Sequence, residues 1–221
     1  MGLALTGKDG QPDGHTHKGE WLSSERALGR RLDREFYARN VLQVAPELLN
    51  KVLATADGRS GRIVEVEAYR GADDPASHGY RGPTARAAVM FGPPGHLYVY
   101  LIYGIHWCAN VVVETDGACA AVLLRALVPL TGLEAMRLAR GPAAKRDSDL
   151  CNGPGKLTQA LNIDGTCNGA ELLASSRGIA IFDDGMPPPQ TPAISTRIGI
   201  NRGADLAWRW YVPGVASLSR P

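Results

Sequence analysis

Two glutamates lie two positions apart in the run Arg62 to Tyr69, which alternates like a β-strand. On an extended strand the Cα atoms of Glu65 and Glu67 are roughly 6.6 Å apart, and the two side chains share one face. A pair of carboxylates at such a separation is what the hydrolysis of a glycosidic bond uses. Surface strands often carry two such glutamates, so a structural role stays open for each of them.

The same alternation assigns the two faces of this strand. One face is apolar and is expected to pack in the core, while the other presents both carboxylates. The core face would hold Val64, Val66 and Ala68, and the other face would hold Ile63, Glu65, Glu67 and Tyr69. Glu67 is favoured for chemistry because Tyr69 follows it on the same face and a loop with His78 comes next.

One arginine, Arg125, interrupts the apolar run Val122 to Leu127. A guanidinium in such a strand needs a partner, because an unpaired buried charge is very costly. A carboxylate such as Glu67 meets this need and would itself be kept ionised by the arginine. The other interpretation is an arginine that faces outward from the edge of a sheet.

The aromatic-rich segment 96–108 contains one glycine, Gly104. Most of its aromatic residues, Tyr100 among them, fit the packing of a sheet. Tyr103 lies beside the glycine, where a tight hairpin would turn, so its ring is expected to project from the tip. A bulky side chain there could wedge between base pairs or could fold back over its own strands, and both remain open.

The composition is that of an ordinary globular protein. The chain has 221 residues, 44% of them hydrophobic, and this length fits one domain. Its net charge of +2 permits nucleic-acid binding without requiring it. No two of the four cysteines form a Cys-x-x-Cys motif, so a zinc ribbon has no support and the thiols are expected to be mostly buried. No apolar run approaches the roughly 20 residues of a membrane span. Without a secretory signal, the expected location is the cytoplasm.

Changes in periodicity and the positions of turn residues predict the secondary structure. Residues 1–31 lack periodicity and are expected to be a flexible tail. Strands are expected at 62–69, 97–113 with a break at Gly104, 118–127, 179–182, 193–200 and 208–212, and helices at 46–53, 84–90, 130–140 and 157–161. Consecutive strands with few long helices between them predict an α+β fold with a largely antiparallel sheet.

Several long motifs, in collinear order from about Leu32 to Pro213, closely resemble the alkyladenine (3-methyladenine) DNA glycosylase family. The matching stretches are 62–69, His78, 95–104, 116–119, 123–127 and 152–157. The resemblance implies that residues 32–221 form one glycosylase domain with a curved sheet, flanking helices and a protruding β-hairpin. It also implies a monomer without metal or cofactor that acts on double-stranded DNA and does not associate with membranes.

The family pattern assigns a role to each matching residue. Glu67 would be the general base that activates water, and Arg125 would help to hold this water and the carboxylate. The base pocket would consist of Tyr69, His78 and Tyr100, with Tyr103 filling the vacated space in the duplex and Asn110 obstructing the amino group of normal guanine. The chain departs from the pattern at Ile105, where some relatives carry methionine, so the contacts of the hairpin tip with DNA are in doubt.

These roles amount to a monofunctional glycosylase for damaged purines of the 3-methyladenine, 7-methylguanine, hypoxanthine or ethenoadenine type. An alkylated purine is cationic and already a good leaving group, so one carboxylate would suffice and Glu65 would be structural. No lysine is expected in the pocket, so a Schiff-base lyase step has no nucleophile. Two alternatives remain, which are a non-catalytic module that binds damaged DNA and a sugar glycosidase that uses Glu65 and Glu67.

Overall fold

Strand β3 (Ser60–Arg70) lies in the middle of the sheet in the computed structural model, which describes residues 27–219. It pairs with β6 (Ala120–Thr131) on one side. On its other side it pairs first with β2 (Val52–Thr55) and then with β10 (Arg209–Tyr211). The strand that carries both glutamates is therefore covered along both edges.

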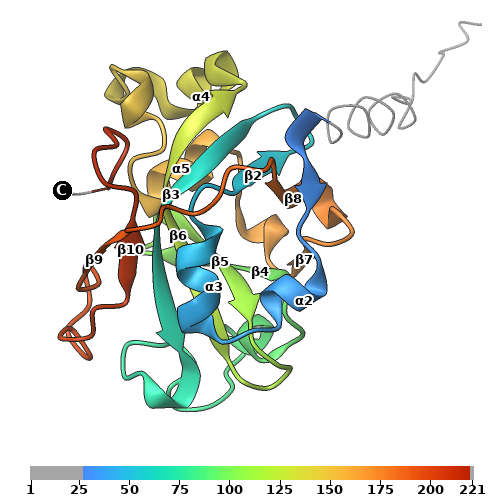
Figure 1. The fold of residues 1–221 in the computed structure, drawn as a ribbon, viewed down its shortest axis with the longest axis vertical. Helices are drawn as coiled ribbons and strands as arrows, with labels where there is room; N and C mark the ends of the chain where they lie inside the picture. The colour runs from blue at the N-terminus through green and yellow to red at the C-terminus, as the bar shows by residue number, and fades with distance from the viewer. Residues whose placement is uncertain (1–26, 220–221) are drawn as a thin grey trace, which may run out of the picture.

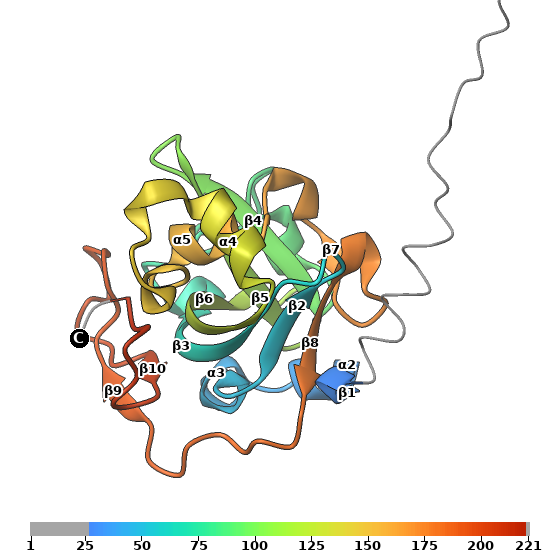
Figure 2. The same ribbon diagram turned by 90° about the horizontal axis from the view of Figure 1, so that it is seen from above.

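The described residues form one ten-stranded sheet in which every pairing is antiparallel. Its strands run in the order β1-β8-β2-β3-β6-β5-β4-β7, with β10 between β3 and β9. The strands not yet given are β1 (Arg30–Arg31), β4 (His96–Ile102), β5 (His106–Val113), β7 (Ala170–Glu171), β8 (Ile179–Asp183) and β9 (Ala193–Ser195). The sheet curls on itself (Figure 2), which confirms the predicted α+β fold with its curved antiparallel sheet.

The helices share one core with the curled sheet. Helix α3 (Val41–Leu48) lies against β3, and α4 (Leu133–Arg140) and α5 (Pro154–Ala160) lie together (Figures 1 and 2), with buried side chains of all three in the main core. A short helix, α2 (Arg34–Tyr37), precedes α3 and is capped by the side chain of Asp33. Among the described residues, no helix has the length and apolar character that a membrane crossing requires.

Helix α3 begins earlier than the sequence pattern predicted. The side chain of Asn40 accepts a hydrogen bond from the amide of Leu42 at 3.0 Å and so caps the helix at this point. The buried residues of α3 recur at helical spacing and are Val41, Val44, Ala45 and Leu48. The prediction of a helix at 46–53 was wrong for its second half, because Val52 begins strand β2.

The other helix and strand boundaries also moved by a few residues. Gly132, with φ of 71°, separates the end of β6 from α4, so the helix expected at 130–140 starts at Leu133. The helix expected at 84–90 is a 3₁₀ turn over Ala88–Phe91. Strand β1, which pairs with β8, lies inside the segment expected to be a tail, and residues 1–26 of that segment lie outside the described residues.

Strand β3 does not keep the simple alternation of its sequence. Its pairing with β6 slips between Ile63 and Glu65 and again between Glu65 and Val66. Ile63 consequently packs in the main core with Val66 and Ala68, although the alternation placed it with the glutamates. Both glutamates are fully buried, so the second face is enclosed as well.

Strands β4 and β5 form the expected hairpin with its turn at Gly104. The turn has positive φ at both central residues, 54° at Tyr103 and 71° at Gly104, and the amide of Ile105 donates to the carbonyl of Ile102 at 3.2 Å. This is the pattern of a type I′ turn, the turn that matches the twist of two hairpin strands. The tip stands out from the rest of the fold, as Figure 2 shows in green.

Candidate active site

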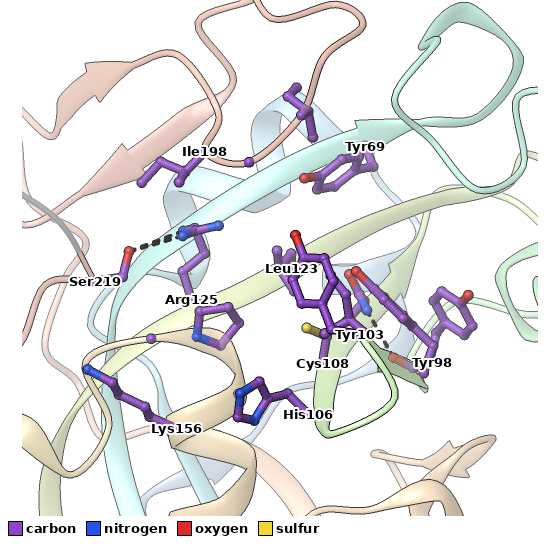
Figure 3. Close-up of a pocket in the computed structure, with 18 of the residues that line it drawn as sticks. Tyr69, Tyr98, Tyr103, His106, Cys108, Leu123, Arg125, Lys156, Ile198 and Ser219 are labelled. Atoms are coloured by element: carbon purple, nitrogen blue, oxygen red, sulfur yellow. Dashed lines mark hydrogen bonds between the residues drawn. The ribbon is translucent and has the colours of Figure 1, made fainter. Parts of the chain in front are cut away.

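A cavity of about 630 Å³ opens between the hairpin, the loop before α5 and the C-terminal segment. Its walls carry aromatic rings from several elements and two guanidinium groups, those of Arg140 and of Arg125, which lies beside Ser219 (Figure 3). The residues lining it include Tyr69, His78, Tyr98, Tyr100, Tyr103, Asn110, Leu123, Arg125, Lys156, Ile198 and Ser219. A flat aromatic molecule with polar edges would suit these walls.

Glu67 lies next to this cavity and has no exposed surface. Its Oε1 accepts a hydrogen bond from the amide of Ile198 at 2.7 Å and lies 3.1 Å from Nη1 of Arg125. Its Oε2 accepts a hydrogen bond from the hydroxyl of Tyr69 at 2.9 Å. Three donors from three segments of the chain therefore fix the orientation of this carboxylate.

Glu65 is as fully buried as Glu67 but accepts more hydrogen bonds. Its Oε1 accepts from Nε of Arg125 at 3.0 Å, from Nε of Arg209 at 2.8 Å and from the hydroxyl of Ser219 at 2.7 Å. Its Oε2 accepts from the amide of Ser219 at 2.7 Å. Burial alone would raise the pKa of Glu65, but the bonds from Ser219 and the two arginines outweigh it and hold the pKa below its ordinary value. A carboxyl in this state is a poor proton donor.

Arg125 reaches both glutamates because the sheet is irregular where it lies. Leu124 pairs with Val66 and Ala126 pairs with Glu65, so Arg125 is an extra residue of β6 between these two pairs. An extra residue of this kind changes the direction of side chains in its strand. The predicted pairing of Arg125 with Glu67 is present, and the pairing with Glu65 is an addition to it.

Arg197 supports the cavity wall from behind. Its guanidinium lies 4.7 Å from the centre of the Tyr69 ring and forms a fully buried ion pair with Asp74, with Nη2 donating to Oδ1 at 2.8 Å. Asp74 in turn accepts from the amide of Ala76 at 3.0 Å, within the loop that leads to His78. One buried ion pair thus connects the loop before His78 with the residue that precedes Ile198.

The opposite wall is a cluster of three aromatic rings. His78 meets Tyr100 edge to face with ring centres 4.5 Å apart, and Tyr98 stacks on Tyr100 at 5.3 Å. Nδ1 of His78 lies 2.9 Å from the Tyr98 hydroxyl. Burial and the nearby charge of Arg86 lower the pKa of His78, so its ring is neutral at pH 7. In the tautomer in which Tyr98 donates to Nδ1, the other ring nitrogen is a donor toward a ligand.

Asn110 and Tyr103 both line the cavity but differ in exposure. Asn110 is buried on β5, and its Nδ2 donates to the carbonyl of Tyr98 at 3.1 Å, which fixes the amide against the wall. Tyr103 is 80% exposed at the hairpin tip, so its ring does not fold back over the strands. Ile105 beside it is 72% exposed. The tip therefore presents two apolar side chains next to the mouth of the cavity.

A comparison with protein-family models matches residues 35–216 to the model described as Methylpurine-DNA glycosylase (MPG). The chain belongs to the methylpurine-DNA glycosylase family. It is therefore a DNA glycosylase, a hydrolase of N-glycosyl bonds that acts in base excision repair. This confirms the family resemblance of the sequence and the enzyme class that it implied.

Bacterial relatives resemble this glycosylase over most of its length. A protein of Burkholderia lata is 58% identical over 87% of this chain and 93% of its own length. A protein of Burkholderia cenocepacia is 60% identical over 84% of this chain and 89% of its own, and one of Rhodopseudomonas palustris is 51% identical over 88% and 93%. All three are provisionally named 3-methyladenine DNA glycosylase.

The glycosylase fold brings all the predicted site residues to one place. Those that line the cavity are Tyr69, His78, Tyr100, Tyr103, Asn110 and Arg125. Glu67 is the exception, because it lies behind the hydroxyl of Tyr69 and does not itself line the cavity. Oε1 of Glu67 contacts two residues of the cavity wall, Ile198 and Arg125, whereas Oε2 contacts the hydroxyl of a third, Tyr69.

Sequence reasoning missed several residues of this glycosylase site. Ile198 contributes a backbone amide, which no side-chain pattern can reveal, and Ser219 is a common residue in the last turn of the chain. Arg197 lies in the segment 193–200, which was expected to be a strand but leaves the sheet after Ser195, and no sequence pattern singled out this arginine. Lys156 lines the cavity, so the expectation of a pocket without lysine was wrong, and its Nζ donates to Oδ1 of Asn152 at 2.8 Å.

Proposed function

We propose that this glycosylase flips a damaged purine out of double-stranded DNA and hydrolyses its N-glycosidic bond with a water activated by Glu67. The observation that carries the proposal is the buried Glu67 carboxylate, which Arg125 and the Ile198 amide hold next to an aromatic cavity. A general base must lie within hydrogen-bond reach of the water that it deprotonates, and its orientation must be fixed. The substrates would be purines of the 3-methyladenine, 7-methylguanine, hypoxanthine and ethenoadenine types.

The aromatic walls support the choice of a purine. Tyr69 on one side and the pair of His78 and Tyr100 on the other provide ring faces and edges for a flat base. Purines alkylated on a ring nitrogen carry a positive charge, and aromatic rings attract such cations in addition to stacking on them. Asn110, fixed by its bond to Tyr98, would exclude the exocyclic amino group of normal guanine.

The proposed step uses Oε2 of Glu67. A carboxylate oxygen has two lone pairs, and Oε2 uses one of them for the Tyr69 hydroxyl. A water bound at the second lone pair would give its proton to Oε2, while its oxygen forms the bond to C1′ of the sugar. The electrons of the C1′–N bond would leave with the purine, which neutralises a cationic base, whereas a neutral base such as hypoxanthine would leave as an anion and take its proton from water. Because the pKa of Glu65 is low, the departing base would receive no proton from it.

The hairpin tip would act on the duplex. A flipped base leaves a gap in the stack, and an inserted side chain can fill this gap. Tyr103 is the exposed ring nearest the cavity mouth, and its positive φ is an unfavourable conformation for a residue other than glycine. Strain of this kind at the tip supports a role for Tyr103 in function. We also propose that the protein acts on DNA as a monomer.

The proposal is tested with duplexes that contain hypoxanthine or 7-methylguanine. We expect the protein to release the free base and to leave an intact abasic strand. Glu67→Gln should reduce release by several orders of magnitude while binding is largely kept, because the amide cannot take up the proton. Glu47→Gln, which alters a glutamate paired with Arg39 at the surface, is the matched control and should retain full activity.

Three outcomes would contradict this proposal in different ways. Turnover by the Glu67→Gln variant would remove Glu67 from the mechanism. Tight binding by the wild-type protein without any base release would indicate a module that only recognises damage. Strand cleavage at the abasic site, lost on Lys156→Ala, would show a lyase step and end the monofunctional assignment.

A further inference from the structure

The last described residues of the chain return to the active site. After β10 the C-terminal segment runs back along the cavity, and Ser219 forms part of the wall beside Arg125 (Figure 3). Ser219 is 94 residues away from Arg125 in sequence and 154 residues away from Glu65. A contact over such a distance in sequence exists only in the folded protein.

Ser219 bonds to both members of the buried ion pair. Its amide donates to Oε2 of Glu65 at 2.7 Å, and its hydroxyl donates to Oε1 at 2.7 Å. The hydroxyl oxygen also accepts from Arg125, from Nη2 at 3.1 Å and from Nε at 3.3 Å. The hydroxyl thus has one donor and two acceptor contacts, which is the full capacity of a serine side chain.

These bonds divide the Arg125 guanidinium into two parts. The edge formed by Nε and Nη2 faces Glu65 and Ser219, whereas Nη1 alone reaches Oε1 of Glu67. A guanidinium whose edge is free prefers to bind a carboxylate through two parallel bonds. Without the Ser219 hydroxyl, the guanidinium could rotate so that Nη2 as well as Nη1 faces Glu67, and the two nitrogens could then bind both of its oxygens.

We propose that Ser219 is a positioning residue that holds Arg125 so that only Nη1 contacts Glu67. Oε2 of Glu67 then stays available for the water that attacks the sugar. The inference rests on the proposed role of Glu67 as general base. It adds to that role a residue at the far end of the chain, which touches neither the reacting bond nor the carboxylate of Glu67 in the described structure.

The test compares Ser219→Ala with Ser219→Thr, which keeps a hydroxyl. Base release from a duplex with hypoxanthine is measured under single-turnover conditions, together with the Kd for that duplex and the Tm of each variant. We expect Ser219→Ala to release base on the order of tenfold more slowly with little change in Kd. The shifted Arg125 guanidinium would hinder the water at Glu67, which acts in the chemical step and not in DNA binding. Threonine should restore most of the rate.

A matched control separates this positioning role from general support of the buried ion pairs. Ser195→Ala is the matched control, because Ser195 accepts from Nη1 of Arg209 at 3.0 Å on the opposite side of Glu65. It should keep the wild-type rate of base release.

Each other result has a definite meaning. A Ser219→Ala variant with the wild-type rate of base release would overturn the inference. If Ser219→Ala and Ser195→Ala lose equal shares of the rate of base release, in proportion to their fall in Tm, Ser219 has a structural role only. The same holds if threonine at position 219 does not restore the rate. A wild-type protein that releases no base from this duplex would instead overturn the proposed function, and the inference with it.

Discussion

Nη1 of Arg125 lies 3.1 Å from Oε1 of Glu67, across two neighbouring strands of the sheet. The same guanidinium lies 3.0 Å from Oε1 of Glu65 through its Nε. One guanidinium therefore forms ion pairs with two buried carboxylates. We assign a structural role to Glu65 and a catalytic role to Glu67. Removing one partner of a buried ion pair leaves an uncompensated charge. Substitutions of the two glutamates should therefore differ in their effects on the free energy of unfolding and on activity.

Replacing Glu65 should destabilise the protein more than replacing Glu67. Glu65→Gln removes the carboxylate that pairs with both Arg125 and Arg209 and leaves Arg125 with Glu67 alone, so we expect a loss of about 3–5 kcal/mol in the free energy of unfolding. Glu67→Gln leaves Arg125 paired with Glu65 and should cost clearly less. Urea denaturation of the two variants measures the difference, and equal losses would contradict the division of roles.

The stability of the protein should fall in acid partly through Glu65. The folded state holds the pKa of this carboxyl below the ordinary value of 4.5, so the unfolded chain takes up the proton first as the pH falls. The contribution of Glu65 is complete above about pH 4.5 and is lost as the pH falls through the pKa of the folded state. Thermal melts over an acidic pH series should show a steeper fall of Tm for the wild type than for Glu65→Gln. Parallel curves would argue against this linkage.

Replacing Tyr103 with glycine should lower the rate of base release without lowering the stability of the protein. Tyr103→Gly relieves a positive φ of 54°, a conformation that costs other residues about 1–2 kcal/mol, so the free energy of unfolding should rise or stay unchanged. Base release from duplex DNA should fall at least tenfold, because nothing fills the vacated space. Leu138→Ala, at a position that is 86% exposed on α4, is the control for loss of an exposed apolar side chain. A variant as active as the wild type would rule out the wedge.

Tyr69 combines a ring that faces the cavity with a hydroxyl that bonds to Glu67. Tyr69→Phe keeps the ring, so we expect an excision rate within a few-fold of the wild type. Tyr69→Ala removes the stacking surface, which is worth about 1–3 kcal/mol per base, and should weaken binding and excision of alkylated purines strongly. Rates and Kd values for both variants separate the two contributions. A severe defect in Tyr69→Phe would show that the hydroxyl itself takes part in the reaction.

Much of the fold could be predicted because local patterns report local structure. The alternation of residues 62–69 predicted a strand, and Gly104 within an aromatic run predicted a hairpin with Tyr103 at its tip. Helix limits were less accurate, as at α3, where the side chain of Asn40 sets the start. Caps and turns depend on single hydrogen bonds, which periodicity does not record.

The residue types of the site and the family to which the chain belongs were determined by the sequence alone. The family resemblance already favoured Glu67 over Glu65 as the base, but only the tertiary structure revealed the different hydrogen-bond partners of these two glutamates. The partners that distinguish them come from distant segments, Ser219 for one and the Ile198 amide for the other. An alternating pattern cannot report an irregularity in strand pairing or a contact across more than a hundred residues. Both depend on how the whole chain packs, and together they turn Arg125 toward the two carboxylates.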